Sequence, residues 1–330
     1  MKHSNIAIFV PHAGCPHKCS FCDQRTISGA QHSPTGLEVA QICSQAVTEM
    51  KEPENAEIAF FGGSFTAINR AYMLELLQAA HPFVKEGKVR GIRISTRPDC
   101  ITPEILDILK MYGVTAIELG AQSMVDEVLA ANERGHSASD AAEASQLIRS
   151  YGFELGLQMM TGLYKSSPER DMLTMQRIID LSPDTVRIYP TVVLKGTVLA
   201  DIMKPEDYIT LDEMAQLCAL MLLRFHEAGI RVIKCGLHAS EFVERDMVGG
   251  YYHPAFREMC ESYIYRRKIE ECLRENGISS GRAVLEICPK GISPGYGHKK
   301  MNSDYFRKNG IDIKLTGSDD VPVYEVNLRR

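Results

Sequence analysis

The sequence predicts an α/β protein: an incomplete or full (β/α) barrel of the TIM type, followed by a small C-terminal α+β appendage. Two observations lead to this prediction. Short β-branched runs alternate with helix-like stretches over the first two thirds of the 330-residue chain, and glycines and polar residues follow one predicted strand after another. Strands separated by helices of this length form right-handed βαβ units with a parallel sheet.

Seven short runs are predicted strands, each rich in apolar or β-branched residues. They are IAIFV (6–10), EIAFF (57–61), GIRIS (91–95), TAIEL (115–119), FELGLQ (153–158), TVRIY (185–189) and IRVIK (230–234). The predicted helices between them cover residues 36–51, 69–81, 102–112, 137–150, 168–181 and 210–228. Six or seven such units are too many for a small open sheet and slightly few for an eight-fold barrel.

Several of these helices carry recognisable start and stop signals. Thr102, Ser139 and Ser167 each precede a proline or an acidic residue, an arrangement typical of a capped first turn. Gly113 and Gly152 stand where two of the helices end and the next strands begin, because glycine adopts the left-handed backbone that closes many helices.

The predicted organisation has three parts. Residues 1–235 form the barrel, residues 236–281 form a lid or linker, and residues 282–330 form a small strand–helix–strand unit. This last unit carries nine basic and six acidic residues, a charge of +3, whereas the remainder carries −8. The appendage is therefore the basic part of a chain whose overall charge is −5.

The composition excludes several classes of protein. A hydrophobic content of 45% and a charged content of 24% are ordinary for a globular domain. No stretch approaches the roughly 20 apolar residues of a membrane span, and the N-terminus lacks the pattern of a signal peptide. We therefore expect a cytoplasmic protein without membrane association, whose scattered cysteines act as small core residues.

The residues that follow the predicted strands identify the candidate site, because chemistry in such barrels collects at the C-terminal strand ends. These segments are the cysteine-rich run CPHKCSFC, Gly62-Gly63-Ser64, Ser95-Thr96-Arg97-Pro98-Asp99, Gly120-Ala121-Gln122-Ser123, Gln158-Met159-Met160-Thr161-Gly162 and Tyr189-Pro190-Thr191. Within them, Arg97 and Asp99 are expected to pair and fix their loop.

The run CPHKCSFC places Cys15, Cys19 and Cys22 within eight residues, and its residues alone leave three interpretations open. The thiols are buried structural cysteines, or they bind zinc with His12 or His17 as the fourth ligand. Alternatively, they hold an iron–sulfur cube whose fourth iron stays open for a small molecule.

CPHKCSFC also fits the C-x3-C-x2-C signature of the radical S-adenosylmethionine (SAM) superfamily, including the aromatic residue before the last cysteine. This resemblance implies an incomplete or full barrel with a [4Fe–4S] cluster on Cys15, Cys19 and Cys22. It also implies that the open iron chelates SAM and that an electron from the cluster releases a 5′-deoxyadenosyl radical, the cofactors carrying the chemistry.

Other segments extend the resemblance over residues 1–235. FFGGSFT is similar to the family's GGE-like segment, which implies that backbone oxygens of Phe61, Gly62 or Gly63 contact the methionine ammonium, with Ser64 where many members have Glu. Ser95 falls where relatives place a ribose-contacting acid. The remaining matched positions around the cofactor are Gln122, Arg134 and Gln158, and an arginine such as Arg134 suits a carboxylate.

RISTRPD, IELGAQS and LGLQMMTGL resemble segments of the oxygen-independent coproporphyrinogen oxidase branch and, more closely, of the Elongator catalytic subunit, which acts on tRNA. YPTVVLKGTVL is similar to the last segment of the Elongator-type barrel, with Lys195 as a candidate substrate residue. Nothing after the barrel has the length or glycine pattern of the Elongator acetyltransferase domain, so acetyl transfer is not expected.

The hypothesis from the sequence is therefore a radical SAM enzyme that modifies a base in RNA, with tRNA as the expected RNA. Flavodoxin or ferredoxin is the expected electron donor. Lys299 and Lys300 in GYGHKKMN are the candidate phosphate contacts of the basic appendage. Two alternatives stay open: a small-molecule or porphyrin-like substrate, and a noncatalytic iron–sulfur or zinc protein that binds nucleic acid.

Overall fold

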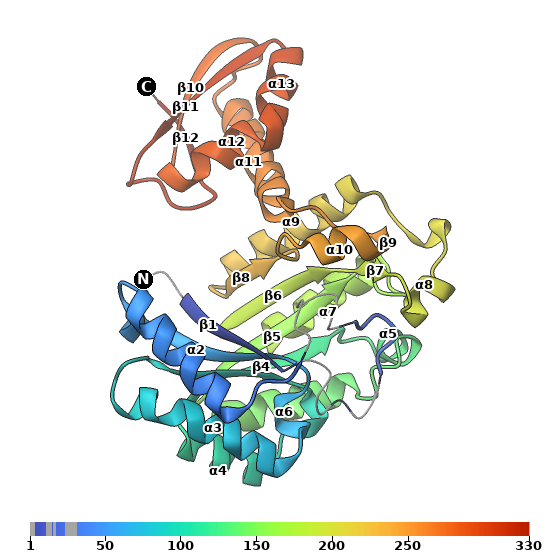
Figure 1. Cartoon of the computed structure of the whole chain (residues 1–330). Coiled ribbons are helices and arrows are strands. Elements are labelled where there is room, and N and C mark those ends of the chain that lie inside the picture. The colour runs from blue at the N-terminus through green and yellow to red at the C-terminus, as the bar shows by residue number, and fades with distance from the viewer. Residues whose placement is uncertain (1–3, 11–14, 16–17, 24–31, 330) are drawn as a thin grey trace. The chain divides into compact units, whose positions relative to one another are not determined.

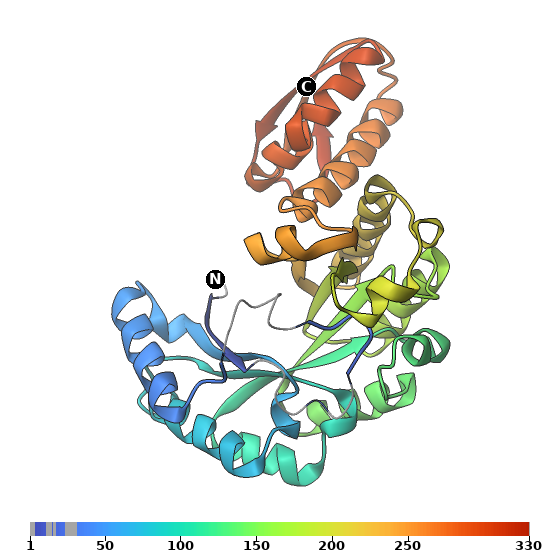
Figure 2. The ribbon, with the colours of Figure 1, turned by 45° about the vertical axis from the view of Figure 1, so that its right-hand side comes forward.

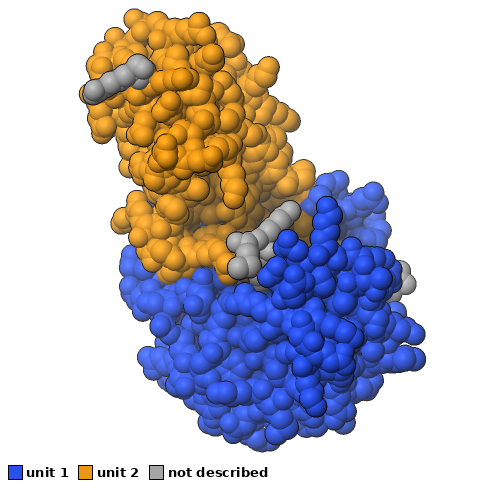
Figure 3. Space-filling view, turned by 90° about the vertical axis from the view of Figure 1, so that its left-hand side faces the viewer, with its two compact units in different colours: residues 1–208, 239–250 blue, residues 209–238, 251–330 orange. Residues whose placement is uncertain are grey.

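The computed structural model describes residues 4–10, 15, 18–23 and 32–329. The chain forms two compact units, coloured separately in Figure 3. Unit 1 comprises residues 1–208 and 239–250, and unit 2 comprises residues 209–238 and 251–330. The division into three parts at residues 235 and 281 stays a prediction.

Unit 1 is built on a curved parallel sheet (Figures 1 and 2). Each strand pairs in parallel with the next strand along the chain. The strands are β1 (Ser4–Val10), β2 (Ala56–Gly62), β3 (Gly91–Thr96), β4 (Val114–Gln122), β5 (Glu154–Thr161) and β6 (Thr185–Pro190). The predicted α/β fold with an incomplete TIM-like barrel is confirmed.

Helices cover the outer, convex side of this sheet (Figure 2). They are α2 (Gly36–Glu49), α3 (Arg70–Lys85), α4 (Pro103–Met111), α6 (Ala138–Ser150) and α7 (Pro168–Asp180). Thr102 and Ser167 cap α4 and α7 as predicted, and the left-handed Gly113 and Gly152 follow α4 and α6. The predicted cap Ser139 is wrong: Ser137 caps α6 through a reciprocal hydrogen-bonded box with Asp140, which begins the helix two residues earlier.

The two faces of the sheet differ in polarity because side chains alternate along a strand. On β3 and β4 the residues Ile92, Ile94, Ile117 and Leu119 are fully buried and belong to the apolar face that the helices cover. The alternate positions of the same strands include the buried or partly buried Arg93, Ser95 and Glu118. The concave face is therefore polar, which is unusual for a sheet buried on both sides.

Five charged residues of the concave face form one ion network, which we call the Arg93 network. Arg93 lies 2.8 Å from Glu57, 3.3 Å from Glu118 and 2.6 Å from Glu154, measured between nitrogen and oxygen, and Arg187 lies 2.6 Å from Glu118. The side chains of Arg93 and Glu57 are fully buried. Burial is tolerated here because every charge has an opposite partner.

Asp171, at the start of α7, gives unit 1 a testable pH dependence. Its carboxylate accepts hydrogen bonds from the Gly162 amide at 2.8 Å and the Ser166 hydroxyl at 2.5 Å, yet burial raises its pKa to about 6. Because the folded pKa exceeds the unfolded one, stability should fall as pH rises from about 4 to about 6, by on the order of 3 kcal/mol.

The measurement is urea unfolding of the wild-type protein and Asp171→Asn at several pH values in this window. The difference between their unfolding free energies should move with pH, in favour of the variant at the higher pH, because Asn carries no charge to desolvate. A difference that stays constant from pH 4 to pH 7 would contradict the raised pKa.

Unit 2 contains two long helices, α9 (Leu211–Glu227) and α11 (Phe256–Glu275), the strand β8 (Arg231–Cys235) and a small sheet. In this sheet β10 (Gly281–Ile287) pairs in parallel with β11 (Ile311–Gly317) and antiparallel with β12 (Val326–Leu328). The short helices α12 (Ile292–Tyr296) and α13 (Met301–Lys308) connect β10 to β11. Residues 281–328 therefore contain the strand–helix–strand arrangement expected for this part of the chain, and β12 lies in the segment VYEVNL that belonged to the same prediction.

Two general expectations bear on this fold. Six of the seven scattered cysteines are buried, and Cys100 is half-buried, which agrees with a role as small core residues. In the described part of the chain, none of the helices combines the length and the apolar character that crossing a membrane requires.

Candidate active site

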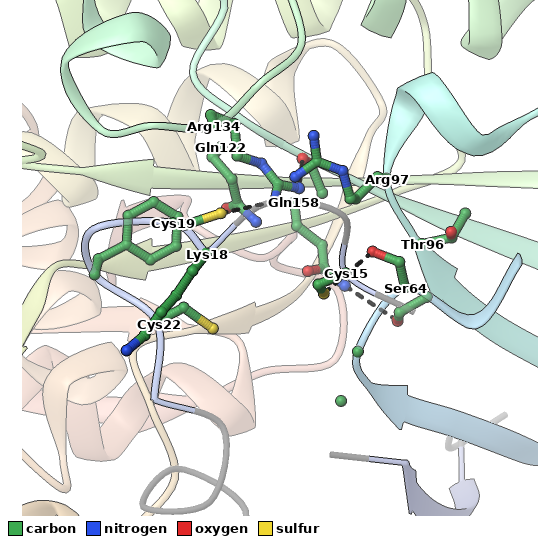
Figure 4. Close-up of a pocket in the computed structure, with 15 residues that line it drawn as sticks. Cys15, Lys18, Cys19, Cys22, Ser64, Thr96, Arg97, Gln122, Arg134 and Gln158 are labelled. Carbon is green, nitrogen blue, oxygen red and sulfur yellow. Dashed lines mark hydrogen bonds between the residues drawn. The ribbon is translucent and has the colours of Figure 1, made fainter. Parts of the chain in front are cut away.

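A cavity of ≈ 250 Å³ lies at the C-terminal ends of the unit 1 strands (Figure 4). The residues predicted from the sequence that line it are Cys15, Cys19, Cys22, Gly62, Gly63, Ser64, Ser95, Gln122, Arg134 and Gln158. They come from segments up to 143 residues apart (158 − 15) that follow or end different strands. The sheet therefore brings together in one cavity the residues that were predicted because they follow the C-terminal ends of strands.

The segment that carries Cys19 and Cys22 is tied to the barrel by Asn132, which is fully buried after α5 (Asp126–Ala131). The Ser20 amide donates to the Asn132 carbonyl at 3.2 Å, and the two side chains also lie 3.2 Å apart. The Ser20 carbonyl in turn accepts from the Leu199 amide at 2.8 Å. These bonds hold the second half of the cysteine motif against the cavity.

The glycine turn after β2 forms another wall. Gly62 has φ 116°, a conformation open to glycine and strained for other residues. The Gly63 amide donates to the Val10 carbonyl at 2.9 Å, and the Ser64 hydroxyl lies 3.5 Å from the Cys15 sulfur. The turn therefore brings polar backbone and a hydroxyl to the first cysteine.

Gln122 reaches the cavity through a β-bulge. The pairing of β4 with β5 shifts register between Gly120 and Gln122, and Gln122 has the left-handed φ of 65°. Its Oε1 is buried and has no hydrogen-bond partner among the described residues. A left-handed non-glycine residue with an unpaired buried oxygen is costly for the fold, and it is the kind of strain that accumulates at functional sites.

Two buried arginines line the cavity. Arg134 donates from Nη1 to the Cys19 sulfur at 3.3 Å and from Nη2 to the Gly120 carbonyl at 2.6 Å. Arg97 is 1% exposed and forms a two-point pair with Asp99 at 2.9 and 3.0 Å. Burial, and then the charges of these two arginines, lower the pKa of the neighbouring His136 to about 4, so His136 is neutral at pH 7.

The floor of the cavity is formed by Ser95 on β3 and Gln158 on β5, the two strands that flank β4. Gln158 Nε2 donates to the Ser95 hydroxyl at 3.3 Å and to Glu118 Oε2 at 2.8 Å. Glu118 belongs to the Arg93 network, so the floor of the cavity rests directly on that network.

The donor set of this cavity fits a cluster with bound SAM. Three thiols are available to iron, and two buried guanidinium atoms, Arg97 Nη1 and Arg134 Nε, have no hydrogen-bond partner among the described residues and can receive a carboxylate. The described side chains contain no preassembled group of three histidines, cysteines or acids able to hold a metal ion; the three cysteines share a cavity instead.

Four other predicted residues that the structure describes lie outside the cavity lining. Phe61 packs against Phe9, with ring centroids 6.2 Å apart, and its ring lies 5.2 Å from the Arg187 guanidinium carbon. Lys195 is exposed and directly follows β7 (Val192–Leu194), which pairs antiparallel with β9 (Met247–Gly250) in a two-stranded sheet of unit 1. Lys299 and Lys300 belong to unit 2. His12 and His17, the candidate zinc ligands, fall outside the described residues.

The structure also adds residues to the site that were not singled out. Lys18, Phe21, Thr96, Arg97 and Gly120 line the same cavity. Gly120 has a clear reason to be glycine, because a Cβ there would lie 2.8 Å from Arg134 Nη2 and 2.9 Å from Gln122 Nε2. Their position in the sequence could have identified three of them, because Thr96 and Arg97 directly follow Ser95 and Gly120 stands two residues before Gln122.

Comparison with known proteins now identifies the family. A family model described as the radical SAM superfamily matches residues 9–177, just over half of the chain. The chain belongs to the radical SAM superfamily. A second family model, described as the Radical_SAM C-terminal domain, matches residues 183–266. The cofactors of this radical SAM enzyme are accordingly a [4Fe–4S] cluster and SAM, and the predicted resemblance is confirmed.

The chain is similar in sequence to curated tRNA uridine(34) acetyltransferases and to Elongator complex protein 3. A tRNA uridine(34) acetyltransferase of Methanocaldococcus infernus is 30% identical over 98% of this chain and 68% of its own length. A protein of the same description from Dehalococcoides mccartyi is 27% identical over 62% of this chain and 52% of its own length. Elongator complex protein 3 of Schizosaccharomyces pombe is 31% identical over 49% of this chain and 30% of its own length. This radical SAM chain spans only part of each relative.

Solved structures agree on the fold. The archaeal Elp3 of Methanocaldococcus infernus superposes with a TM-score of 0.56 at 22% identity, covering 74% of this chain and 61% of that one. Coproporphyrinogen III oxidase from Escherichia coli gives 0.51 at 20% identity, covering 69% and 53%. Both predicted branches of the radical SAM superfamily therefore share the barrel seen here.

Proposed function

We propose that this radical SAM enzyme modifies a base in tRNA and that Cys15, Cys19 and Cys22 hold its [4Fe–4S] cluster. The observation that carries the proposal is the single cavity lined by all three cysteines, two arginines and the Gln122 and Gln158 amides. When bound, the reduced cluster supplies the electron that cleaves SAM and releases the radical used on the substrate.

The residues of the chain would divide the work of binding and orientation. The Gly62-Gly63 turn offers backbone to the methionine ammonium, and Arg134 receives the methionine carboxylate. Arg97 adds a second buried cation, held in place by Asp99, and one of its nitrogens has no hydrogen-bond partner among the described residues. Ser95, Gln122 and Gln158 supply the polar contacts to the remainder of the cofactor.

The tRNA substrate is supported by the names of the relatives, several of which act on uridine 34 of tRNA. It is also supported by a turn in unit 2. Lys299 and Lys300 are exposed and have left-handed φ values of 50° and 64°. The fully buried Asn302 braces this turn by donating to the carbonyls of Ser262 and Gly295 at 2.8 and 3.1 Å.

We propose that these two lysines contact RNA phosphates. Reversing both charges, Lys299→Glu with Lys300→Glu, should weaken tRNA binding by about 10-fold or more and flatten its dependence on salt, because each phosphate contact releases a counterion. The measurement is a salt titration of tRNA affinity by filter binding.

A matched control is the double change Lys85→Glu and Lys88→Glu, which changes the net charge by the same amount. Both lysines are exposed, Lys85 as the last residue of α3 and Lys88 three residues later. The control should keep most of the tRNA affinity. Equal losses in the two double variants, or no tRNA binding by the wild-type protein, would favour a small-molecule substrate instead.

The experiment that tests the whole proposal has two parts. The anaerobically reconstituted protein should contain about four irons per chain and release 5′-deoxyadenosine from SAM under reductant. A strain that lacks the gene should lose one modified nucleoside from total tRNA by mass spectrometry. Zinc in place of iron, without SAM cleavage, would overturn the radical SAM assignment of the cysteines.

The remaining parts of the proposal concern the surroundings of the enzyme. The electron would come from a flavodoxin or a ferredoxin, and the reaction would take place in the cytoplasm, where tRNA and these carriers are found together. Reduction of the reconstituted cluster by purified flavodoxin, followed by optical spectroscopy, tests the donor directly.

A further inference from the structure

Glu118 lies beneath the floor of the cavity and has no direct place in the cofactor contacts proposed above. Its side chain is 1% exposed, and it accepts from Arg187 through both oxygens, at 2.6 Å from Nε to Oε2 and 2.9 Å from Nη2 to Oε1. Arg93 Nη1 lies 3.3 Å from Oε1. These guanidinium partners lower the pKa of Glu118 against the effect of burial, so the group is a carboxylate.

A carboxylate can only accept hydrogen bonds, and this decides the orientation of the neighbouring amide. The atom of Gln158 that lies 2.8 Å from Glu118 Oε2 must be the donor Nε2. The second Nε2 hydrogen is directed to the Ser95 hydroxyl at 3.3 Å. Both hydrogens are therefore used within the floor, which leaves the carbonyl oxygen Oε1 as the group that Gln158 offers to the cavity.

We propose that Glu118 is a positioning residue that fixes the Gln158 amide with its carbonyl oxygen toward the cavity, so that the site selects a hydrogen-bond donor of bound SAM. The inference rests on the proposed function, because it takes SAM as the occupant. The buried Glu118 carboxylate thereby decides whether Gln158 presents a hydrogen-bond acceptor or a hydrogen-bond donor to the cavity.

Glu57 is the natural control because it is the other fully buried carboxylate of the Arg93 network. It pairs with Arg93 at 2.8 Å and accepts from Thr115 at 3.1 Å, and it does not line the cavity. Changing either glutamate to glutamine removes one buried charge from the same network. Only the change at Glu118 gives Gln158 a neighbour that can donate, and thereby lets the Gln158 amide turn over.

The experiment is a double-mutant cycle on the affinity of the anaerobically reconstituted enzyme for SAM, measured by equilibrium dialysis. Glu118→Gln should weaken SAM binding about 10-fold, as expected when one hydrogen bond to a buried polar group is lost. Gln158→Leu should weaken it to a similar degree, and the double variant should be no weaker than Gln158→Leu alone. Glu57→Gln should stay within about twofold of wild type.

A second variant keeps the test decisive if Glu118→Gln does not fold. Ser95→Ala removes the other anchor of Nε2 without touching a charge. Because Ser95 also contacts SAM directly in the proposed site, part of its loss should persist in Gln158→Leu, but the loss should be about 3-fold larger in the wild-type background than in Gln158→Leu. A Glu118 loss that persists in the Gln158→Leu background, a Ser95 loss of the same size in both backgrounds, or an equal loss in Glu57→Gln would overturn the inference. A wild-type protein that carries a full cluster and fails to bind SAM would overturn the proposed function instead.

Discussion

Replacing Cys19 by alanine should abolish both the cluster and the cleavage of SAM. Cys19 is 7% exposed, lies 3.3 Å from Arg134 Nη1 and is held by the Ser20–Asn132 contacts, so no other cysteine can take its place without moving that segment. Iron should fall from about four atoms per chain to a residual level, and 5′-deoxyadenosine should fall to background. Iron analysis and chromatography of anaerobic reactions measure the two quantities.

Cys100 provides the matched control for this experiment. It follows β3 close to the site, but it does not line the cavity, and burial raises the pKa of its thiol to about 11, which keeps it protonated at neutral pH. Cys100→Ala should therefore retain iron and SAM cleavage. Normal activity of Cys19→Ala, or loss of iron from Cys100→Ala to the same extent, would contradict the ligand assignment.

Replacing Arg93 by methionine should have the largest effect on stability. The change removes the shared partner of three carboxylates, two of which, on Glu57 and Glu118, are almost completely buried. Breaking a buried ion pair from one side costs about 3–5 kcal/mol, because an uncompensated charge stays behind. The free energy of unfolding of Arg93→Met, measured by urea titration, should fall by about that amount.

Arg70→Met is the control, because Arg70 is also in unit 1 and pairs with Glu104 at 3.1 Å in an exposed position. An exposed pair of this kind contributes about 0–1 kcal/mol. The two variants lose the same charge and gain the same side chain, so their difference isolates burial. Similar losses in both would show that the Arg93 network contributes no more than a surface ion pair.

Much of the unit 1 fold could be predicted because its helices and strands follow local rules. All seven predicted strands are present, β1 to β6 in unit 1 and β8 in unit 2, with ends shifted by at most three residues, as in β4 and β5. β-Branched runs and helix caps act within a few residues, and the sequence displays them directly. The cap at Ser137 was misplaced because Ser139 offers the same chemistry two residues later, and the choice depends on Asp140.

The site could be predicted only in part, because residue type and strand position do not determine pairing. The cysteines, glycines and amides at strand ends were identified, whereas Arg97 was expected only to pair with Asp99. It does so, and its third nitrogen has no hydrogen-bond partner in the described part of the chain and lies at the cavity. Asn132 and Glu118 were missed because their roles depend on contacts with residues 112 and 40 positions away in the chain, and no local pattern reveals such contacts.

The Arg93 network also bears on how unit 1 reaches its native state. Glu57, Arg93, Glu118, Glu154 and Arg187 stand on β2, β3, β4, β5 and β6, one charged residue on each strand. A sheet that lacks β3 leaves Glu57 without its network partner Arg93, and a sheet that lacks β4 leaves Arg187 without Glu118. Loss of β2, β5 or β6 removes one of several partners, so partial sheets are penalised relative to the complete sheet. The charges that support the cavity floor therefore also couple the strands into one cooperative folding unit.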